Sequence, residues 1–171
     1  PGYRIVQQAR SHNLPVTAIP GPCAAMTALS IAGLPSNHFY FAGFLPAKTS
    51  AKQAALQSLQ TIPATLIFYE SPYRLLKTLK EMIHVFGEQR QAVLTKELTK
   101  IYETVYHDQL GELLQQLQQE KIMGEWVILV EGAPKEMSEQ TNQAWDTHAV
   151  LSVLLKELPL KQAVNLTVKL T

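Results

Sequence analysis

The sequence has a single cysteine, Cys23, among its 171 residues. No disulfide can form within the chain, which fits a reducing compartment, so we expect a cytoplasmic protein. No signal peptide is visible, and the longest apolar stretch, from Ala24 to Leu34, is too short and too mixed to span a bilayer. These absences predict a protein of the cell interior without a membrane-spanning segment.

Charge of one sign is also scarce, because 15 basic and 14 acidic residues leave a formal net charge of +1. A dedicated nucleic-acid-binding module usually carries a clear basic excess. Any contact with RNA is therefore expected from a local patch, or from a part of the protein outside this chain.

Two kinds of ligand-binding motif are missing. The sequence has no phosphate-binding loop of the Walker type and no G-x-G-x-x-G, so a classical dinucleotide-binding domain is not indicated. The histidines are scattered without the spacing of metal ligands, and we expect no bound metal. They are His12, His38, His84, His107 and His148.

Helical and strand-like patterns alternate along the chain, which is typical of an α/β protein. Ser71 and Pro72 predict the start of one helix, with serine as N-cap and proline at the first helical position, and Asp108 is expected to cap another. The predicted helices are 3–12, 23–32, 52–59, 71–86 and 108–117, and the predicted strands are 16–19, 38–44, 64–69, 92–98, 104–107 and 126–130.

The last part of the chain differs in composition. Residues 134–147 are polar and contain proline, and we interpret them as a linker. Two short helical patterns follow in residues 148–171, on either side of Pro159. Such a pair could begin a helix-turn-helix or could pack on the preceding domain, and the pattern leaves both open. Because the chain begins without methionine and ends inside an apolar-periodic segment, we expect both ends to be cut.

A first candidate binding segment reads Ile19-Pro20-Gly21-Pro22-Cys23-Ala24-Ala25, a predicted strand that enters a tight turn and then a helix. Small side chains let a ligand lie against the backbone, and the free N–H groups of a helix start can bond it. A close-packed strand-to-helix turn is the alternative. Cys23 is not expected to be a nucleophile, because no histidine is near it in the sequence.

Polar residues end two of the predicted strands. Glu70 follows a buried strand, where open α/β sheets place ligands, and Arg74 lies in a first helical turn, where the dipole disfavours a cation. A phosphate or carboxylate partner would explain Arg74, and a surface ion pair is the alternative. In Thr95–Lys100, followed by Glu103, two lysines and two carboxylates crowd a strand end. They could position a phosphate backbone or move a proton, and a solvated charged loop is the alternative.

Glu131 ends a further predicted strand and is followed by Gly132. If the strand ends share one edge of the sheet, then Glu70, Glu97 and Glu131 form an acidic rim. Such a rim would suit a ligand that carries an amine and hydroxyl groups.

Longer motifs lead further than composition and periodicity. The runs PGYRIVQQAR and VTAIPGPCAAMTALSIAGLPSNHFYFAGFLPAK resemble the ribosomal RNA small subunit methyltransferase I branch of the tetrapyrrole methylase family, as do TLIFYESPYRLLKTL, LTKELTKIYETV and GEWVILVEG. The motifs follow one another in family order and cover nearly the whole chain. GPCAA, FYESP and KELTK together separate this branch from relatives that methylate corrin rings.

The resemblance implies a fold of two α/β domains with the methyl donor, S-adenosylmethionine, in the cleft between them. In the branch, a GTPxISDPG-like segment and a half-domain precede the position of Pro1 and Gly2, so one wall of the donor pocket would lie outside this chain. The expected domains are the end of the N-terminal methylase domain (1–35), the complete C-terminal methylase domain with a mixed sheet (36–133), the linker (134–147) and the start of a small helical, helix-turn-helix-like domain (148–171).

The resemblance also implies the roles of particular residues. The segment 130–132 is expected to close the donor pocket. The donor-binding positions are Cys23, Ala24, Tyr69, Glu70, Ser71 and Leu98.

The branch product is a 2′-O-methylated cytidine in small-subunit ribosomal RNA, so the expected partners are that RNA or the 30S subunit, and a second copy of the chain in a homodimer. We expect Lys96, Glu97 and Lys100 to be catalytic, with Glu97 accepting the ribose hydroxyl proton. Arg74 and Lys100 are expected to hold phosphates of the RNA.

Two other functions stay open. A relative could methylate a tetrapyrrole or a modified protein side chain. Alternatively, the piece itself could be a non-catalytic RNA-docking or dimerisation module, because half of the donor cleft would be absent, and the fragment alone is expected to be inactive.

Overall fold

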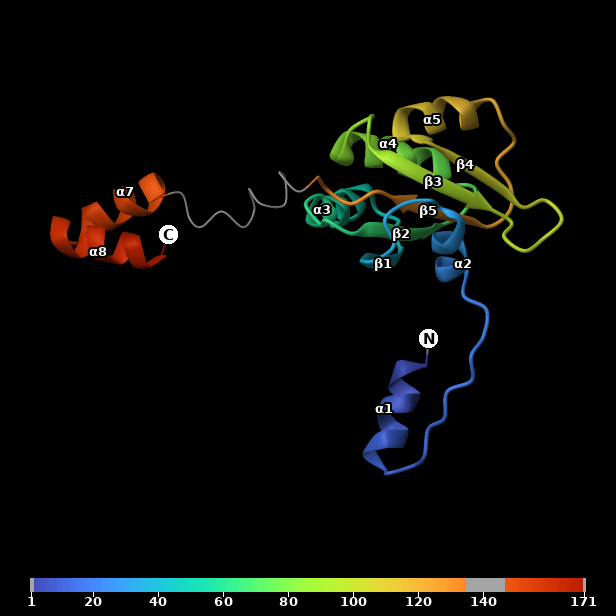
Figure 1. Ribbon diagram of the computed structural model, residues 1–171, viewed down its shortest axis with the longest axis horizontal. Helices are drawn as coiled ribbons and strands as arrows, with labels where there is room; N and C mark the ends of the chain where they lie inside the picture. The colour runs from blue at the N-terminus through green and yellow to red at the C-terminus, as the bar shows by residue number, and fades with distance from the viewer. Residues whose placement is uncertain (1, 135–146, 171) are drawn as a thin grey trace.

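The computed structural model describes residues 2–134 and 147–170, and it confirms the α/β class (Figure 1). A five-stranded sheet has the order β1-β2-β5-β3-β4. The strands are β1 (Phe39–Phe44), β2 (Thr65–Glu70), β3 (Gln91–Lys96), β4 (Thr104–Gln109) and β5 (Trp126–Val130).

The sheet is mixed, as predicted. β1 pairs with β2 in parallel, whereas β5 is antiparallel to both β2 and β3, and β4 is antiparallel to β3. β1, β2 and β3 therefore run in the same direction and end at one edge, which we name the carboxyl edge. β5 begins at this edge and ends at the opposite one.

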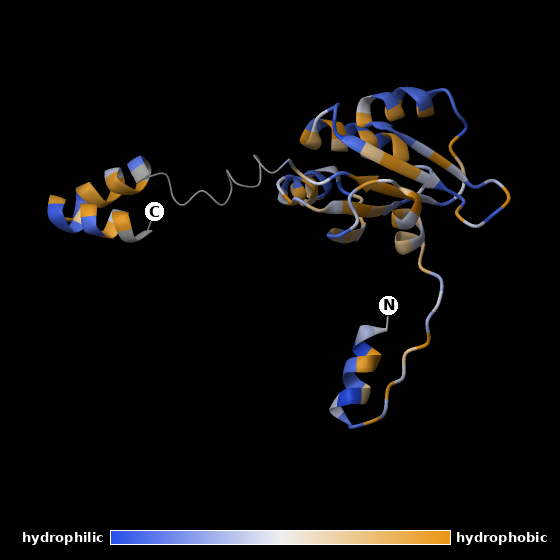
Figure 2. Ribbon diagram, viewed as in Figure 1, coloured by the Kyte–Doolittle hydropathy of each residue, from blue (hydrophilic) through white to orange (hydrophobic). Residues whose placement is uncertain are grey.

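The two faces of the sheet carry different helices (Figure 1). One face packs against α3 (Thr49–Leu59), α4 (Leu75–Phe86) and α5 (Leu110–Gln118) in the larger hydrophobic cluster. The other packs against α2 (Ala24–Ile31), whose small residues allow close approach. Successive side chains of a strand point to opposite faces, so the central strands β2, β3 and β5 are apolar on both, as the orange middle part of these strands in Figure 2 shows.

Three further helices are not part of these two layers of helices on the sheet. None of the residues of α1 (Tyr3–Ser11) is buried. α7 (Thr147–Glu157) and α8 (Leu160–Leu170) pack against each other across the turn at Pro159, with Val150 and Ala163 buried. No helix in the two described ranges has the length and hydropathy to cross a membrane.

The strand predicted at 16–19 is wrong. These residues have no regular structure, and Ile19 is 90% exposed. A strand needs a neighbour to pair with, and the sheet pairs only β1 to β5 among the described residues. β-branched residues alone favour an extended backbone but do not supply that neighbour.

Two predicted helix starts also differ. Ser71 does not cap α4, because residues 71–74 form a turn in which the N–H groups of Arg74 and Leu75 donate to the Ser71 carbonyl, and the helix begins at Leu75. Asp108 belongs to β4, and Gln109 takes the N-cap position of α5. The predicted linker at 134–147 lies outside the described residues except for its two ends, and the predicted domain boundaries stay predictions.

Candidate functional site

The carboxyl edge gathers most of the residues that the sequence singles out. Register places Tyr69 beside Val127 and Val127 beside Thr95, and one step further it places Glu70 beside Trp126 and Trp126 beside Lys96. The first row faces α2 and the second faces α4 and α5, because neighbouring residues of a strand alternate. The predicted donor-binding residues Tyr69 and Glu70 therefore lie on opposite faces.

On the α2 face, Tyr69 joins the sheet to the start of α2. The Ala25 N–H donates to the Tyr69 hydroxyl at 3.0 Å, and the Tyr69 ring meets Phe41 and Phe44 edge to face. Burial raises the pKa of Tyr69 above its ordinary value, and Cys23 adds to the rise while the Ala25 N–H opposes it. Tyr69 is thus a neutral hydroxyl with a fixed position.

The start of α2 itself is open. Cys23 is the N-cap residue but makes no side-chain capping bond, and Cys23 and Ala24 are both exposed. Leu98 packs against the same cluster as α2 and Tyr69. The structure therefore brings Cys23, Ala24, Tyr69 and Leu98 to one face, as a shared binding site requires.

Thr95 lies on this face too, although the sequence did not distinguish it from its neighbours. It is 0% exposed, and its hydroxyl has no hydrogen-bond partner among the described residues. A buried hydroxyl without a partner costs free energy, and such groups are rare in native interiors.

On the α4 face, Glu70 is 3% exposed and fully engaged. One carboxylate oxygen accepts from the Thr78 hydroxyl at 2.7 Å, and the other accepts from the Ser71 N–H at 2.8 Å. Arg74 Nε lies 3.3 Å from that second oxygen. The internal partners of Glu70 therefore use both of its oxygens.

Arg74 connects Glu70 to the loop that follows β1. Its Nη2 donates to the Leu45 carbonyl at 2.7 Å and to the Pro46 carbonyl at 3.2 Å. The ion pair with Glu70 is not an ordinary surface pair, because the carboxylate side is buried. In this arrangement Arg74 ties a strand end to a neighbouring loop.

Glu97 lies just beyond β3 in the left-handed region, at φ 53°. Its carboxylate accepts from the Glu125 N–H at 2.8 Å and from Lys100 Nζ at 3.1 Å. The hydrogen bond from Glu125 is the main cause that lowers the pKa of Glu97, and Lys100 adds to it. Glu97 is therefore a carboxylate that holds the 124–125 loop.

Lys96 and Lys100 supply positive charge at the same strand end. Lys96 Nζ lies 5.6 Å from the centre of the Trp126 ring, and that ring stacks on Tyr106. Lys100 is half exposed and bridges Glu97 and Glu125, which raises the pKa of Lys100.

The predicted acidic rim is only partly present. Glu70 and Glu97 lie at the carboxyl edge, but Glu131 follows β5, which runs the other way and ends at the opposite edge. The segment 130–132 therefore does not close a pocket at the carboxyl edge. Close packing explains the glycine at position 132, because a Cβ there would lie 2.5 Å from the Ala64 nitrogen.

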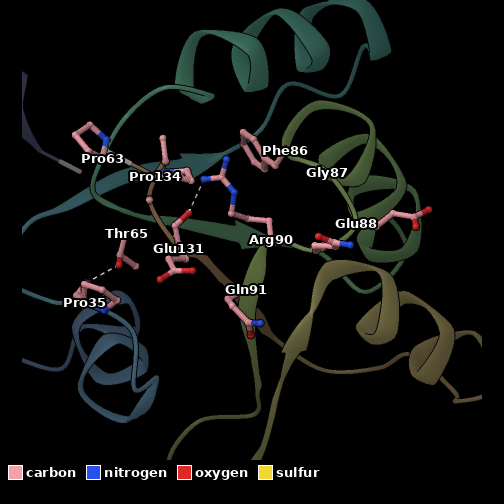
Figure 3. Close-up of a pocket in the computed structure, with 13 residues that line it drawn as sticks. Pro35, Pro63, Thr65, Phe86, Gly87, Glu88, Arg90, Gln91, Glu131 and Pro134 are labelled. Atoms are coloured by element: carbon pink, nitrogen blue, oxygen red, sulfur yellow. Dashed lines mark hydrogen bonds between the residues drawn. The ribbon is translucent and has the colours of Figure 1, made fainter. Parts of the chain in front are cut away.

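The opposite edge has a cavity of about 930 Å³ (Figure 3). Arg90 Nη1 donates across it to the Glu131 carbonyl at 3.2 Å. Its wall is formed by Pro35, Pro63, Thr65, residues 86–91 and residues 131–134. None of the predicted donor-binding or catalytic residues lines this cavity.

Besides Thr95, the sequence did not single out Lys52 and Thr78, which lead to Glu70 at the carboxyl edge. Lys52 is 1% exposed, and its Nζ donates to the Thr78 hydroxyl at 2.8 Å. The only available signal was their position on the apolar sides of predicted helices, where a lysine or threonine is unusual.

The family model of tetrapyrrole (corrin/porphyrin) methylases matches residues 1–114. Two similar relatives are named ribosomal RNA small subunit methyltransferase I. The protein of Escherichia coli O157:H7 is 43% identical over 99% of this chain, and that of Pseudomonas aeruginosa is 44% identical over 100%. The chain spans 59% and 61% of the length of these relatives.

Solved structures agree on the fold. A cobalt precorrin-4 methyltransferase of cobalamin biosynthesis has a TM-score of 0.56 and 16% identity, over 76% of this chain and 57% of its own. Uroporphyrin-III C-methyltransferase of Thermus thermophilus has a TM-score of 0.54 and 17% identity, over 83% and 60%. At these identities the likeness concerns the fold alone.

Proposed function

The chain belongs to the tetrapyrrole methylase family, and we propose from this premise that the intact protein transfers a methyl group from S-adenosylmethionine to small-subunit ribosomal RNA. The observation that carries the substrate class is the 43–44% identity to two relatives with that name, across nearly the whole chain. The finer proposal is that the acceptor is the 2′-hydroxyl of a cytidine.

The methyl donor is proposed to contact the α2 face of the carboxyl edge. Small, exposed residues at the start of α2 leave backbone N–H groups accessible, and Tyr69 and Leu98 lie beside them. The hydroxyl of Thr95, which has no partner among the described residues, lies on the same face. These features fit a ligand that carries both polar groups and apolar surface. Glu70 and Ser71 end the same strand, but Glu70 faces α4 with both carboxylate oxygens engaged, so the donor contact expected of these two residues is not proposed.

The reaction breaks the bond between sulfur and the methyl carbon and forms a bond from that carbon to the ribose oxygen. The hydroxyl proton leaves to a base, and S-adenosylhomocysteine is released. Alignment of the two reactants supplies much of the acceleration. Positive charge from Lys96, Lys100 and Arg74 is proposed to hold RNA phosphates near the edge.

Methyl transfer from labelled S-adenosylmethionine tests the function directly. The intact protein should label small ribosomal subunits and leave a tetrapyrrole substrate unlabelled. A 2′-O-methyl group blocks alkaline cleavage of the next phosphodiester bond, so the label should appear in an alkali-resistant dinucleotide that contains cytidine. Labelling of the tetrapyrrole alone would replace the proposal with the corrin-type activity, and no labelling of either would favour a docking role.

Glu97 is proposed as the proton acceptor, and its lowered pKa makes it a weak base that needs a well-aligned hydroxyl. Glu97→Gln keeps a side-chain oxygen for the Glu125 N–H but removes the charge. We expect kcat to fall about a hundredfold, the usual range for loss of a general base. A normal kcat would leave Glu97 the single role of anchoring the 124–125 loop.

A homodimer is also proposed. β1 is an edge strand, and its aromatic side chains are exposed together with apolar residues of α1. Exposed apolar side chains on an unpaired edge strand are typical of an interface. Light scattering of the intact protein should give twice the chain mass, and a monomer at micromolar concentration would contradict the proposal.

A further inference from the structure

A continuous chain of polar contacts runs through the interior between α3, α4 and the end of β2. Lys52 donates to Thr78, Thr78 donates to Glu70, and Glu70 pairs with Arg74. Arg74 then reaches the carbonyls of Leu45 and Pro46. Lys52, Thr78 and Glu70 are each at most 3% exposed.

The two ends of this series of contacts hold the two ends of one loop. Residues 45–48 connect β1 to α3, and Lys52 lies in the first turns of that same helix. The loop is therefore held at its start by Arg74 and at its far end by Lys52, with Glu70 and Thr78 between them. The loop lies at the carboxyl edge, because β1 ends there beside β2.

Stability alone does not explain why this network is polar. Burial lowers the pKa of Lys52, and Glu81 and Glu70 only oppose that change. Glu81 is 7% exposed, and both of its carboxylate oxygens lack a hydrogen-bond partner among the described residues. Apolar side chains of similar volume are often as stable as buried charges or more stable. What a fully bonded polar chain does provide is one fixed geometry.

We infer that Lys52 is a positioning residue, which acts through Thr78, Glu70 and Arg74 to hold the 45–48 loop in place for the RNA acceptor. The inference rests on the proposed function for its acceptor. Lys48 in this loop is exposed and presents a cation at the edge where β2 and β3 also end. The donor-side residues Cys23, Ala24 and Tyr69 lie on the other face of the sheet, so the relay should leave donor binding unchanged.

The test compares matched variants of the intact protein. Lys52→Met and Thr78→Val break the relay, whereas Lys52→Arg and Thr78→Ser preserve a donor and a hydroxyl at the two positions. Lys80→Met is the charge-matched control, because Lys80 lies on the same helix α4 but is exposed and outside the relay.

The expected result distinguishes an effect on use of the acceptor from an effect on binding of the donor. The relay-breaking variants should lower kcat/KM for small ribosomal subunits at least tenfold, while the dissociation constant of S-adenosylmethionine changes less than twofold. The conservative variants and Lys80→Met should stay near the wild type. Equal loss for donor and acceptor, or no loss for either, would overturn the inference.

A second readout does not depend on methyl transfer. Trypsin cleavage after Lys48 reports how firmly the loop is held, and it should become at least tenfold faster in Lys52→Met and Thr78→Val but not in Lys80→Met. If the wild type lacks activity on ribosomal subunits, the proposed function fails while this cleavage still decides the relay. Unchanged cleavage would overturn the relay itself.

If Lys52→Met does not fold, a double variant tests the inference instead. Lys52→Met with Glu81→Met removes the buried cation together with the buried Glu81 carboxylate, which has no hydrogen-bond partner among the described residues. No new uncompensated charge then remains there. The double variant should fold and show the same fast cleavage after Lys48. A folded double variant with wild-type cleavage would contradict the inference.

Discussion

Tyr69 and Glu70 are neighbours in β2, yet they belong to different environments. Tyr69 faces a single helix of small residues and shares its surface with an exposed turn. Glu70 faces three helices and is enclosed by Thr78, Ser71 and Arg74. One side of the strand end is thus arranged for a ligand to approach, and the other side is arranged to keep the strand end rigid.

The largest effect should come from the enclosed side. Glu70→Ala leaves Lys52, Thr78 and Arg74 without the carboxylate that joins them, and loss of one member of a buried ionic network costs about 3–5 kcal/mol. Urea unfolding of the 171-residue chain measures the change. Glu70→Gln is the control, because its amide oxygen keeps one acceptor and should recover part of the loss. A cost below about 1 kcal/mol for Glu70→Ala, as at a surface ion pair, would show that the network is not coupled.

The contrast between these two neighbours marks the limit of what the sequence predicts. The alternation of side chains and the buried character of β2 follow from the apolar run of residues 64–69. Whether Glu131 joins Glu70 at one edge does not, because strand direction in a mixed sheet is decided by pairing between distant segments. The partners of Glu70 are likewise set by the packing of α3 on α4, which brings Lys52 to Thr78.

The contact between Gly124 and Glu97 at the carboxyl edge should give the next largest effect on stability. Gly124 has φ 84°, and a Cβ there would lie 2.7 Å from the Glu97 carboxylate. Gly124→Ala should therefore cost about 1–3 kcal/mol, from the left-handed backbone and from displacement of Glu97 out of its bond to the Glu125 N–H.

The same substitution in a Glu97→Ala background isolates the contact. With the Glu97 carboxylate gone, only the backbone cost of about 1–2 kcal/mol should remain. Chemical denaturation of the four proteins of this cycle gives the coupling energy. Strict additivity of the two substitutions would mean that Glu97 does not hold the 124–125 loop.

The open side should tolerate substitution better. Tyr69→Phe removes only the hydroxyl that accepts from the Ala25 N–H, so we expect a loss of about 1 kcal/mol in unfolding free energy. Its effect on the intact protein should fall on the donor, with a higher dissociation constant for S-adenosylmethionine and unchanged trypsin cleavage after Lys48. Lys52→Met is expected to do the reverse, with unchanged donor affinity and faster cleavage. If the two variants showed the same changes, the two faces of β2 would not have different roles.

Thr95→Val should have the smallest effect on stability, and in the opposite direction. Valine has nearly the shape of threonine, and the hydroxyl that it removes is buried without a partner among the described residues. Relief of that desolvation predicts a gain of up to about 1 kcal/mol for the chain without donor. If the hydroxyl serves the donor, the same variant should bind S-adenosylmethionine more weakly although it is more stable. A gain in stability with unchanged donor affinity would remove Thr95 from the donor site, and a loss of stability would mean that the hydroxyl has a partner within the fold.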